Sequence, residues 1–241
     1  MIETMSASLG TWSSISDVDT FFNRFSHNTA YKDGDTKLRI GNYITIQDGT
    51  YNAIWEIAGF DMEHNQTAAD GTTYDNGYGI CFIPKTYVAK SAWNNVDSVS
   101  GGYKSSYIHN TTLPNIMTNI KNILGSHVVT RNVLLSNSVN SNYYSNAYTW
   151  TISEATLMSA GQMIGTFSSN RNKYDDGEAK YKLPLFNFES YSMGTYFWTR
   201  GIWGYENNDY RAWNIQASSE SFDNWGVENS SLGVRPLIYL R

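Results

Sequence analysis

The sequence predicts a mixed α+β fold, in which short strands alternate with a few amphipathic helices. Three observations lead to this prediction. Apolar residues recur at helical spacing in residues 105–125, and they alternate with polar residues in short runs such as 43–46 and 53–58. The 241 residues are 41% hydrophobic and only 16% charged, which is enough apolar material for one large or two small domains.

A short amphipathic helix is predicted near the N-terminus, within residues 12–28. Ser16 is the expected N-cap, Asp19 lies in the expected first turn, and three phenylalanines between residues 21 and 25 share one face. Such a helix can dock on its own domain or on a partner. We expect it to dock on its own domain.

Strands follow in the first half of the chain, at 37–40, 43–46, 53–58 and 78–84. Asp48-Gly49 indicates a hairpin between the second and third of these strands. The fourth is a continuous apolar run that contains Cys81, so we expect this lone cysteine to be a small buried hydrophobe.

Two further helices are predicted, at 105–125 and 153–163. Pro114 suits the first turn of the former and Gly125 its end, while Ser153 is the expected N-cap of the latter. Further β-rich segments are predicted at 128–136, 196–200, 211–215 and 233–240, and polar loops at 61–77, 138–147 and 166–179.

Composition excludes several classes of protein. The net charge is −5 and no basic run occurs, so a nucleic-acid binder is not expected. No apolar stretch approaches the roughly 20 residues that span a bilayer, and we expect no membrane insertion. One cysteine leaves no intrachain disulfide. No N-terminal signal pattern is visible, which favours a virion component over a cell-surface adhesin.

Three short motifs in the last fifth of the chain carry a family resemblance. Phe197-Trp198-Thr199-Arg200, Ala212-Trp213 and Gly233-Val234-Arg235-Pro236 together resemble the formylglycine-generating-enzyme-like branch of the C-type lectin fold. Segments 101–114, 126–136 and 182–186 look like the same group, so the resemblance covers roughly residues 37–241. It implies an α+β, C-type-lectin-like domain over 37–241, with two helices and short irregular antiparallel strands, preceded by a helical attachment segment over 1–36.

The resemblance also implies a use. In this branch, the variable proteins of diversity-generating retroelements display a variable stretch just before the conserved ending, and members occur in phage tail or head proteins and in bacterial surface proteins. Here Asn, Ser, Asp and Tyr are frequent between Tyr205 and Ser231, although an ordinary polar loop would also have this composition.

The expected ligand-binding residues lie in this stretch, where Tyr and Trp supply contact area and Asn and Ser supply adaptable hydrogen bonds. They are Trp203, Tyr205, Asn207, Asn208, Tyr210, Asn214, Ser219, Ser221, Asp223, Trp225, Glu228 and Asn229. We assign the framework residues Trp198, Arg200, Trp213 and Arg235 to the scaffold instead.

Known catalytic and metal-binding patterns are missing from the sequence. The formylglycine-generating reaction needs two cysteines, and the calcium-dependent sugar motifs of lectins do not occur. The acidic runs 33–35 and 175–178 suit solvated turns better than a cation site. The four histidines lack zinc spacing, and His127 is expected to be a hydrogen-bonded structural residue. We therefore predict no enzyme activity, no metal and no cofactor.

The leading expectation is a phage or prophage receptor-binding or adhesion protein, located in the virion, or on the bacterial cell surface if derived from a prophage. Its expected partners are a bacterial surface protein or glycan and other virion proteins, and a homotrimer is the favoured assembly. Two alternatives remain: a structural head or tail decoration protein without a ligand, and a calcium-dependent bacterial lectin.

Overall fold

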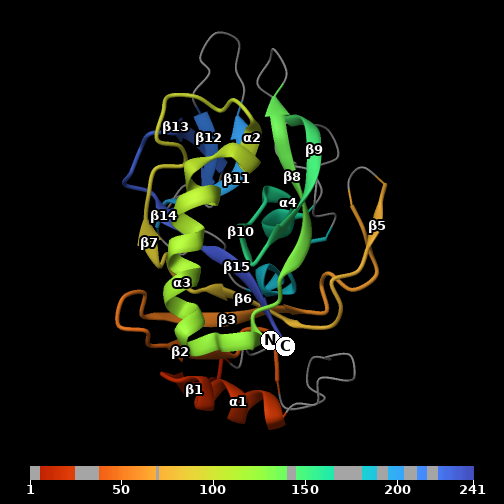
Figure 1. Cartoon of the computed structure of the whole chain (residues 1–241), viewed down its shortest axis with the longest axis vertical. Coiled ribbons are helices and arrows are strands. Elements are labelled where there is room, and N and C mark those ends of the chain that lie inside the picture. The colour runs from red at the N-terminus through yellow and green to blue at the C-terminus, as the bar shows by residue number, and fades with distance from the viewer. Residues whose placement is uncertain are drawn as a thin grey trace.

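The structure, a computed structural model, is built around two β-sheets of different strand number (Figure 1). It describes residues 6–24, 38–68, 71–139, 145–165, 181–188, 195–203, 211–215 and 222–241. Helices and strands both contribute to the core, so the predicted mixed α+β class is confirmed.

The larger sheet has six strands in the order β1-β2-β3-β6-β15-β10, and all neighbours are antiparallel except β1 and β2. The strands are β1 (Ser8–Trp12), β2 (Tyr43–Ile46), β3 (Ala53–Phe60), β6 (Ile80–Pro84), β15 (Pro236–Leu240) and β10 (Ala155–Leu157). Every residue of β6 and β15 is buried, as expected for strands in the middle of a covered sheet.

The smaller sheet has five strands in the order β13-β12-β11-β14-β7. The strands are β13 (Phe222–Gly226), β12 (Arg211–Ile215), β11 (Phe197–Trp203), β14 (Gly233–Val234) and β7 (Ala89–Lys90). Arg235 alone separates β14 from β15, so one short segment supplies a strand to each sheet.

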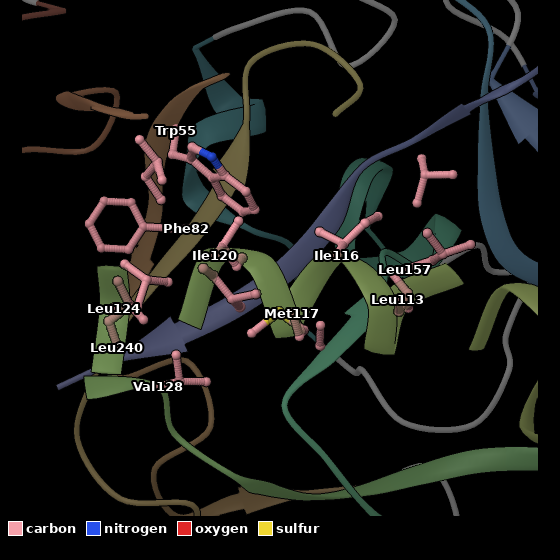
Figure 2. Packing of buried hydrophobic residues seen from close by; sticks show 14 of the residues in the cluster. Trp55, Phe82, Leu113, Ile116, Met117, Ile120, Leu124, Val128, Leu157 and Leu240 are labelled. Carbon is pink, nitrogen blue, oxygen red and sulfur yellow. The ribbon is translucent and has the colours of Figure 1, made fainter. Parts of the chain in front are cut away.

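Helix α3 (Leu113–Leu124) covers the larger sheet. Its Ile116, Ile120 and Leu124 are buried in one cluster with Trp55 and Phe82 (Figure 2). The remaining helical elements are short: α2 (Gly102–Ser105), the π-helix η1 (Ile108–Thr112), η2 (Gly125–His127), α4 (Ala160–Ile164) and η3 (Pro184–Asn187). Two hairpins complete the described structure: a short one of β4 (Gln66–Thr67) with β5 (Thr73–Tyr74), and a long one of β8 (Arg131–Val139) with β9 (Ser145–Ser153).

The N-terminal helix α1 (Ile15–Arg24) docks on its own domain, as predicted. Val18, Phe21 and Phe22 are buried in the main core, and β1 pairs with β2. The Phe22 ring also stacks on His127, with centroids 4.6 Å apart. Residues 6–24 therefore pack on the same core as the rest of the described chain.

The start of α1 differs from the prediction, because the helix begins before Ser16. The Asp17 carboxylate accepts hydrogen bonds from the backbone N–H groups of Ser13 (2.8 Å) and Ser14 (2.9 Å). These bonds, led by that from Ser13, lower the pKa of Asp17. Ser14 and Asp17 thus satisfy the first N–H groups, as a capping box does.

The predicted helix over 153–163 is wrong in its first half. β9 extends to Ser153, and Ala155 to Leu157 form β10, which pairs with β15. Only Ala160–Ile164 is helical, and its N-cap is Ser159, which forms a capping box with Gln162. The short apolar run at 155–158 suits either period, and the strand partner some 80 residues later decides between them.

Three smaller predictions also change. The expected strand at 37–40 is not a strand in its described part, where Arg39 and Asn42 close a turn. The expected loop at 138–147 carries strand at both ends, with residues 140–144 outside the described part. The single helix at 105–125 is divided into α2, η1 and α3, although Pro114 opens α3 and Gly125 ends it as expected.

A buried ion pair joins the β8–β9 hairpin to the connection after β3. Arg131 and Glu63 are 0% and 1% exposed, and their Nη1 and Oε1 atoms lie 2.5 Å apart. Asn76 donates to the second Glu63 oxygen (2.9 Å), and the hydroxyl of Tyr181 donates to the first (3.3 Å). Such a pair is stable only when these further bonds are made, because both charges have lost their water.

The lone cysteine behaves as predicted. Cys81 lies in β6 and is fully buried, and burial raises the pKa of its thiol far above the usual range. The thiol therefore stays protonated and unreactive. His127 is hydrogen-bonded, also as predicted, to Asp19 (2.8 Å) and to the Arg241 carbonyl oxygen (2.7 Å).

Truncating Phe22 should destabilise the whole domain if α1 is part of its core. We expect Phe22→Ala to lower the free energy of unfolding by about 3–5 kcal/mol, because a buried ring is lost. The control Thr20→Ala, on the exposed side of α1, should change it by no more than about 0.5 kcal/mol. Urea unfolding measures the free energy of unfolding of both variants. If both substitutions have equally small effects, α1 is not part of the core.

The buried and exposed ion pairs should differ in their contribution to stability. Glu63→Gln leaves the Arg131 charge buried without its counter-ion, and should cost about 3–5 kcal/mol. Glu154→Gln breaks an equally short pair with Lys121, but this pair is partly exposed (30% and 40%) and should cost at most about 1 kcal/mol. Urea unfolding at neutral pH tests the contrast, which fails if the two losses are alike.

Candidate ligand-binding face

The edge of the smaller sheet carries the polar and aromatic side chains that suit a binding site. Among the described strands, β13 pairs only with β12, so it is an edge strand. Asp223, Asn224 and Trp225 are half-buried, whereas Ala212 to Ile215 in the neighbouring strand are buried. An edge strand presents unpaired backbone groups as well as side chains.

Five half-buried residues define what we call the β13 edge: Tyr196, Arg211, Asp223, Asn224 and Trp225. Their contacts hold them in place. Asn224 accepts a hydrogen bond from Arg211 (2.7 Å), and Asp223 accepts one from the Trp225 indole (3.2 Å). The rings of Tyr196 and Trp225 are 5.0 Å apart. Alternation along β13 puts Asp223 and Trp225 on one side of the sheet and Asn224 on the other.

Behind this edge lies a rigid scaffold. Trp198, Arg200, Trp213 and Arg235 are all at least 95% buried, which is consistent with the structural role assigned to them. The Trp198 indole donates to the Ser91 carbonyl oxygen (2.8 Å). Arg235 donates to the Pro84 carbonyl oxygen (3.0 Å) and lies over the Phe197 ring, 4.6 Å from its centroid.

The structure brings some of the predicted ligand-binding residues together. Asp223 and Trp225 lie on the β13 edge, and Glu228 is exposed just after it. Asn229 is half-buried and accepts bonds from the backbone and hydroxyl of Ser231 (2.9 and 2.5 Å), so its side chain holds a turn. The backbone of Trp203 ends β11, but its side chain lies outside the described part, as do Tyr205, Asn207, Asn208, Tyr210, Ser219 and Ser221.

Asn214 is placed differently from the expectation of an exposed ligand contact. It is completely buried in β12, opposite Asp223. Neither its amide nitrogen nor its amide oxygen has a hydrogen-bond partner within the described residues. Burying such a group without partners costs about 1–3 kcal/mol, so Asn214 cannot be explained by packing alone.

Three residues of the β13 edge were not singled out from the sequence, namely Tyr196, Arg211 and Asn224. Arg211 begins a predicted strand, and Asn224 lies in the stretch where Asn, Ser, Asp and Tyr are frequent. Treating 222–226 as an edge strand would have marked all of its side chains as accessible.

The described residues offer no metal centre. They contain no group of three or more His, Cys, Asp and Glu side chains that would hold an ion. The acidic runs 33–35 and 175–178 lie outside the described ranges. Within those ranges, no helix is long and apolar enough to cross a membrane.

Comparison with protein-family models, with curated proteins and with solved structures finds no match to this chain. The arguments about function therefore rest on the residues and their geometry.

Scaffold and edge residues should respond differently to truncation. Trp198→Ala should lower the free energy of unfolding by about 3–5 kcal/mol, because it empties the core and removes a buried hydrogen bond. Trp225→Ala should cost only about 1–2 kcal/mol, because the ring is already half in solvent. Thermal and urea unfolding of both variants check this order, which is contradicted if Trp225→Ala is the more damaging.

Proposed function

We propose that this chain is a phage or prophage receptor-binding or adhesion protein that engages its target along the β13 edge. The observation that carries the proposal is the group of half-buried aromatic, charged and amide side chains at the β13 edge, beside Ala212 to Ile215 of β12, which are buried. The fold within which we place it is the C-type-lectin-like fold that the sequence motifs resemble.

The energetics of such an edge favour binding. Four of the five residues of β12 are buried, and the strand pairs with β13 over all five, so little backbone freedom remains to be lost when a target binds. Trp225 and Tyr196 supply large contact area at low cost in side-chain entropy. Arg211, Asp223 and Asn224 add donors and acceptors that fix the orientation of a target.

The target in this proposal is a protein or glycan of the bacterial surface, and the location is the virion, or the bacterial surface for a prophage product. The stretch between 203 and 229 would be the diversified part of a variable protein of a diversity-generating retroelement. Attachment to other virion proteins through α1 would have to use its exposed side, because Phe21 and Phe22 are buried. A homotrimer is the proposed assembly.

The test is binding of the fluorescently labelled protein to a panel of bacterial isolates, measured by flow cytometry. On an isolate that binds it, Trp225→Ala should weaken binding by about 30-fold or more, because central aromatic residues dominate interfaces. The control Ile54→Thr changes an exposed residue of the other sheet and should bind as the parent does.

Other outcomes select the alternatives. A protein that binds no isolate, but is required for stable heads or tails, would be a structural decoration protein. Binding that is abolished by EDTA and restored by calcium would point to a calcium-dependent lectin. Equal binding by the parent and Trp225→Ala would remove the β13 edge as the site.

A further inference from the structure

A concave site lies between η1 and α3 on one side and the β9–β10 segment on the other. Its volume is about 730 Å³, which is within the usual range for small-molecule sites. One wall comes from η1 and α3, and the other from Thr130, the end of β9 and β10. We call it the α3 groove; it shares no residue with the β13 edge, and α3 and β10 can be followed in Figure 1.

The α3 groove has an aliphatic surface. Leu113, Pro114 and Met117 line it from the helix, and Ile152 and Ala155 line it from the strands. Ile152 is 73% exposed, the largest exposure among the bulky apolar side chains described. The strand side of the groove is therefore apolar and open to solvent at Ile152.

The charges of the groove cancel. Lys121 and Glu154 both line it, and they form an ion pair with 2.5 Å between Nζ and Oε1. The other polar lining groups are neutral amides and hydroxyls, namely Asn110, Thr118, Thr130, Thr151 and Ser153. A charged ligand would find no net opposite charge here. Apart from the imidazole of His109, the described lining residues include no aromatic ring on which a sugar or base could stack.

His109 supplies a polar anchor in the groove. It is 91% buried, and its Nδ1 atom is buried without a hydrogen-bond partner within the described residues. Burial, assisted by the positive charges of Arg200 and Lys104, lowers the pKa of His109 to about 4. The ring is therefore neutral at pH 7, and it offers one donor and one acceptor.

The π-helix accounts for the position of this histidine. Leu113 N–H bonds to the Ile108 carbonyl oxygen, five residues earlier, and Pro114 follows directly. Proline has no backbone N–H, and in a regular α-helix its ring clashes with the carbonyl group of the turn before it. The wider π-turn before Pro114 relieves this clash. The wider turn buries both Ile108 and His109. Single π-turns within helices are frequent at functional sites.

We propose that the α3 groove binds an uncharged small molecule with an aliphatic body and one hydrogen-bonding group that pairs with His109. The aliphatic wall covers the body, and the cancelled charges disfavour carboxylates, phosphates and amines. The inference does not depend on the function proposed for the β13 edge.

The probe is 1-octanol, titrated into the full chain labelled with ¹³C at its methionine methyl groups. Met117 lines the groove and reports on it, while Met163 is buried in a separate core cluster and serves as an internal control. We expect a saturable shift of the Met117 methyl signal with the Met163 signal unchanged. Octanoate and octylammonium should bind at least about 10-fold more weakly, since each would bury an uncompensated charge.

Two pairs of proteins assign the binding to the groove. Thr118→Trp places a large ring in the groove and should abolish the Met117 shift, whereas Asn115→Trp, exposed on α3 but outside the lining, should keep it. His109→Phe keeps a ring of similar size without its nitrogens and should weaken octanol binding by about 5-fold relative to the parent. An unchanged Met163 signal shows that each variant is folded.

Several results would overturn the proposal. They are a Met117 shift that does not saturate, equal shifts of Met117 and Met163, octanoate binding as tight as that of octanol, or full binding by Thr118→Trp. Unchanged affinity in His109→Phe would also overturn it, because the histidine would then make no bond to the ligand.

Discussion

The architecture depends on the buried guanidinium of Arg235 at the point where one segment passes from the smaller sheet to the larger. On one side it donates to the carbonyl oxygen of Pro84, at the end of β6, and on another it covers the ring of Phe197, at the start of β11. β6 belongs to the larger sheet and β11 to the smaller. Because Arg235 is 1% exposed, these contacts also compensate for the water that its charge has lost. Arg235 therefore links the start of β11, in the smaller sheet, to the end of β6, in the larger.

The β13 edge and the α3 groove use the same core in different ways. At the edge, buried β11 and β12 hold half-exposed side chains that already contact one another. In the groove, a π-turn just before a proline positions a histidine whose Nδ1 atom has no hydrogen-bond partner within the described residues. The first arrangement suits a large and varied surface, and the second a small and specific molecule.

Much of the fold could be predicted from local pattern. The continuous apolar run of β6, the helical spacing of α3 and the turn at Asp48-Gly49 each identified the correct element.

Predictions failed where a residue distant in the sequence decides the local structure. Ala155 to Leu157 become a strand because β15 is beside them, and Glu63 is buried because Arg131, 68 residues later, neutralises it. The α3 groove could not be predicted from the sequence for the same reason: His109 and Ile152 are distant in the sequence and line one site only in the folded chain. Of the candidate site, residue type predicts Asp223 and Trp225, and both lie on the β13 edge. The complete burial of Asn214 is not predictable in this way, because composition does not reveal which face of a strand is covered.

The central place of β15 also bears on how the chain acquires its structure during synthesis. Residues 236–240 are inserted between β6 and β10, whose sequences are made much earlier. Until they leave the ribosome, the larger sheet stays divided, and the edges of β6 and β10 have no partner. Contacts between residues so distant in sequence also form slowly. From the synthesis of β6 until that of β15, the nascent chain therefore has an apolar strand edge without its final partner, and in this interval association with other chains competes with folding.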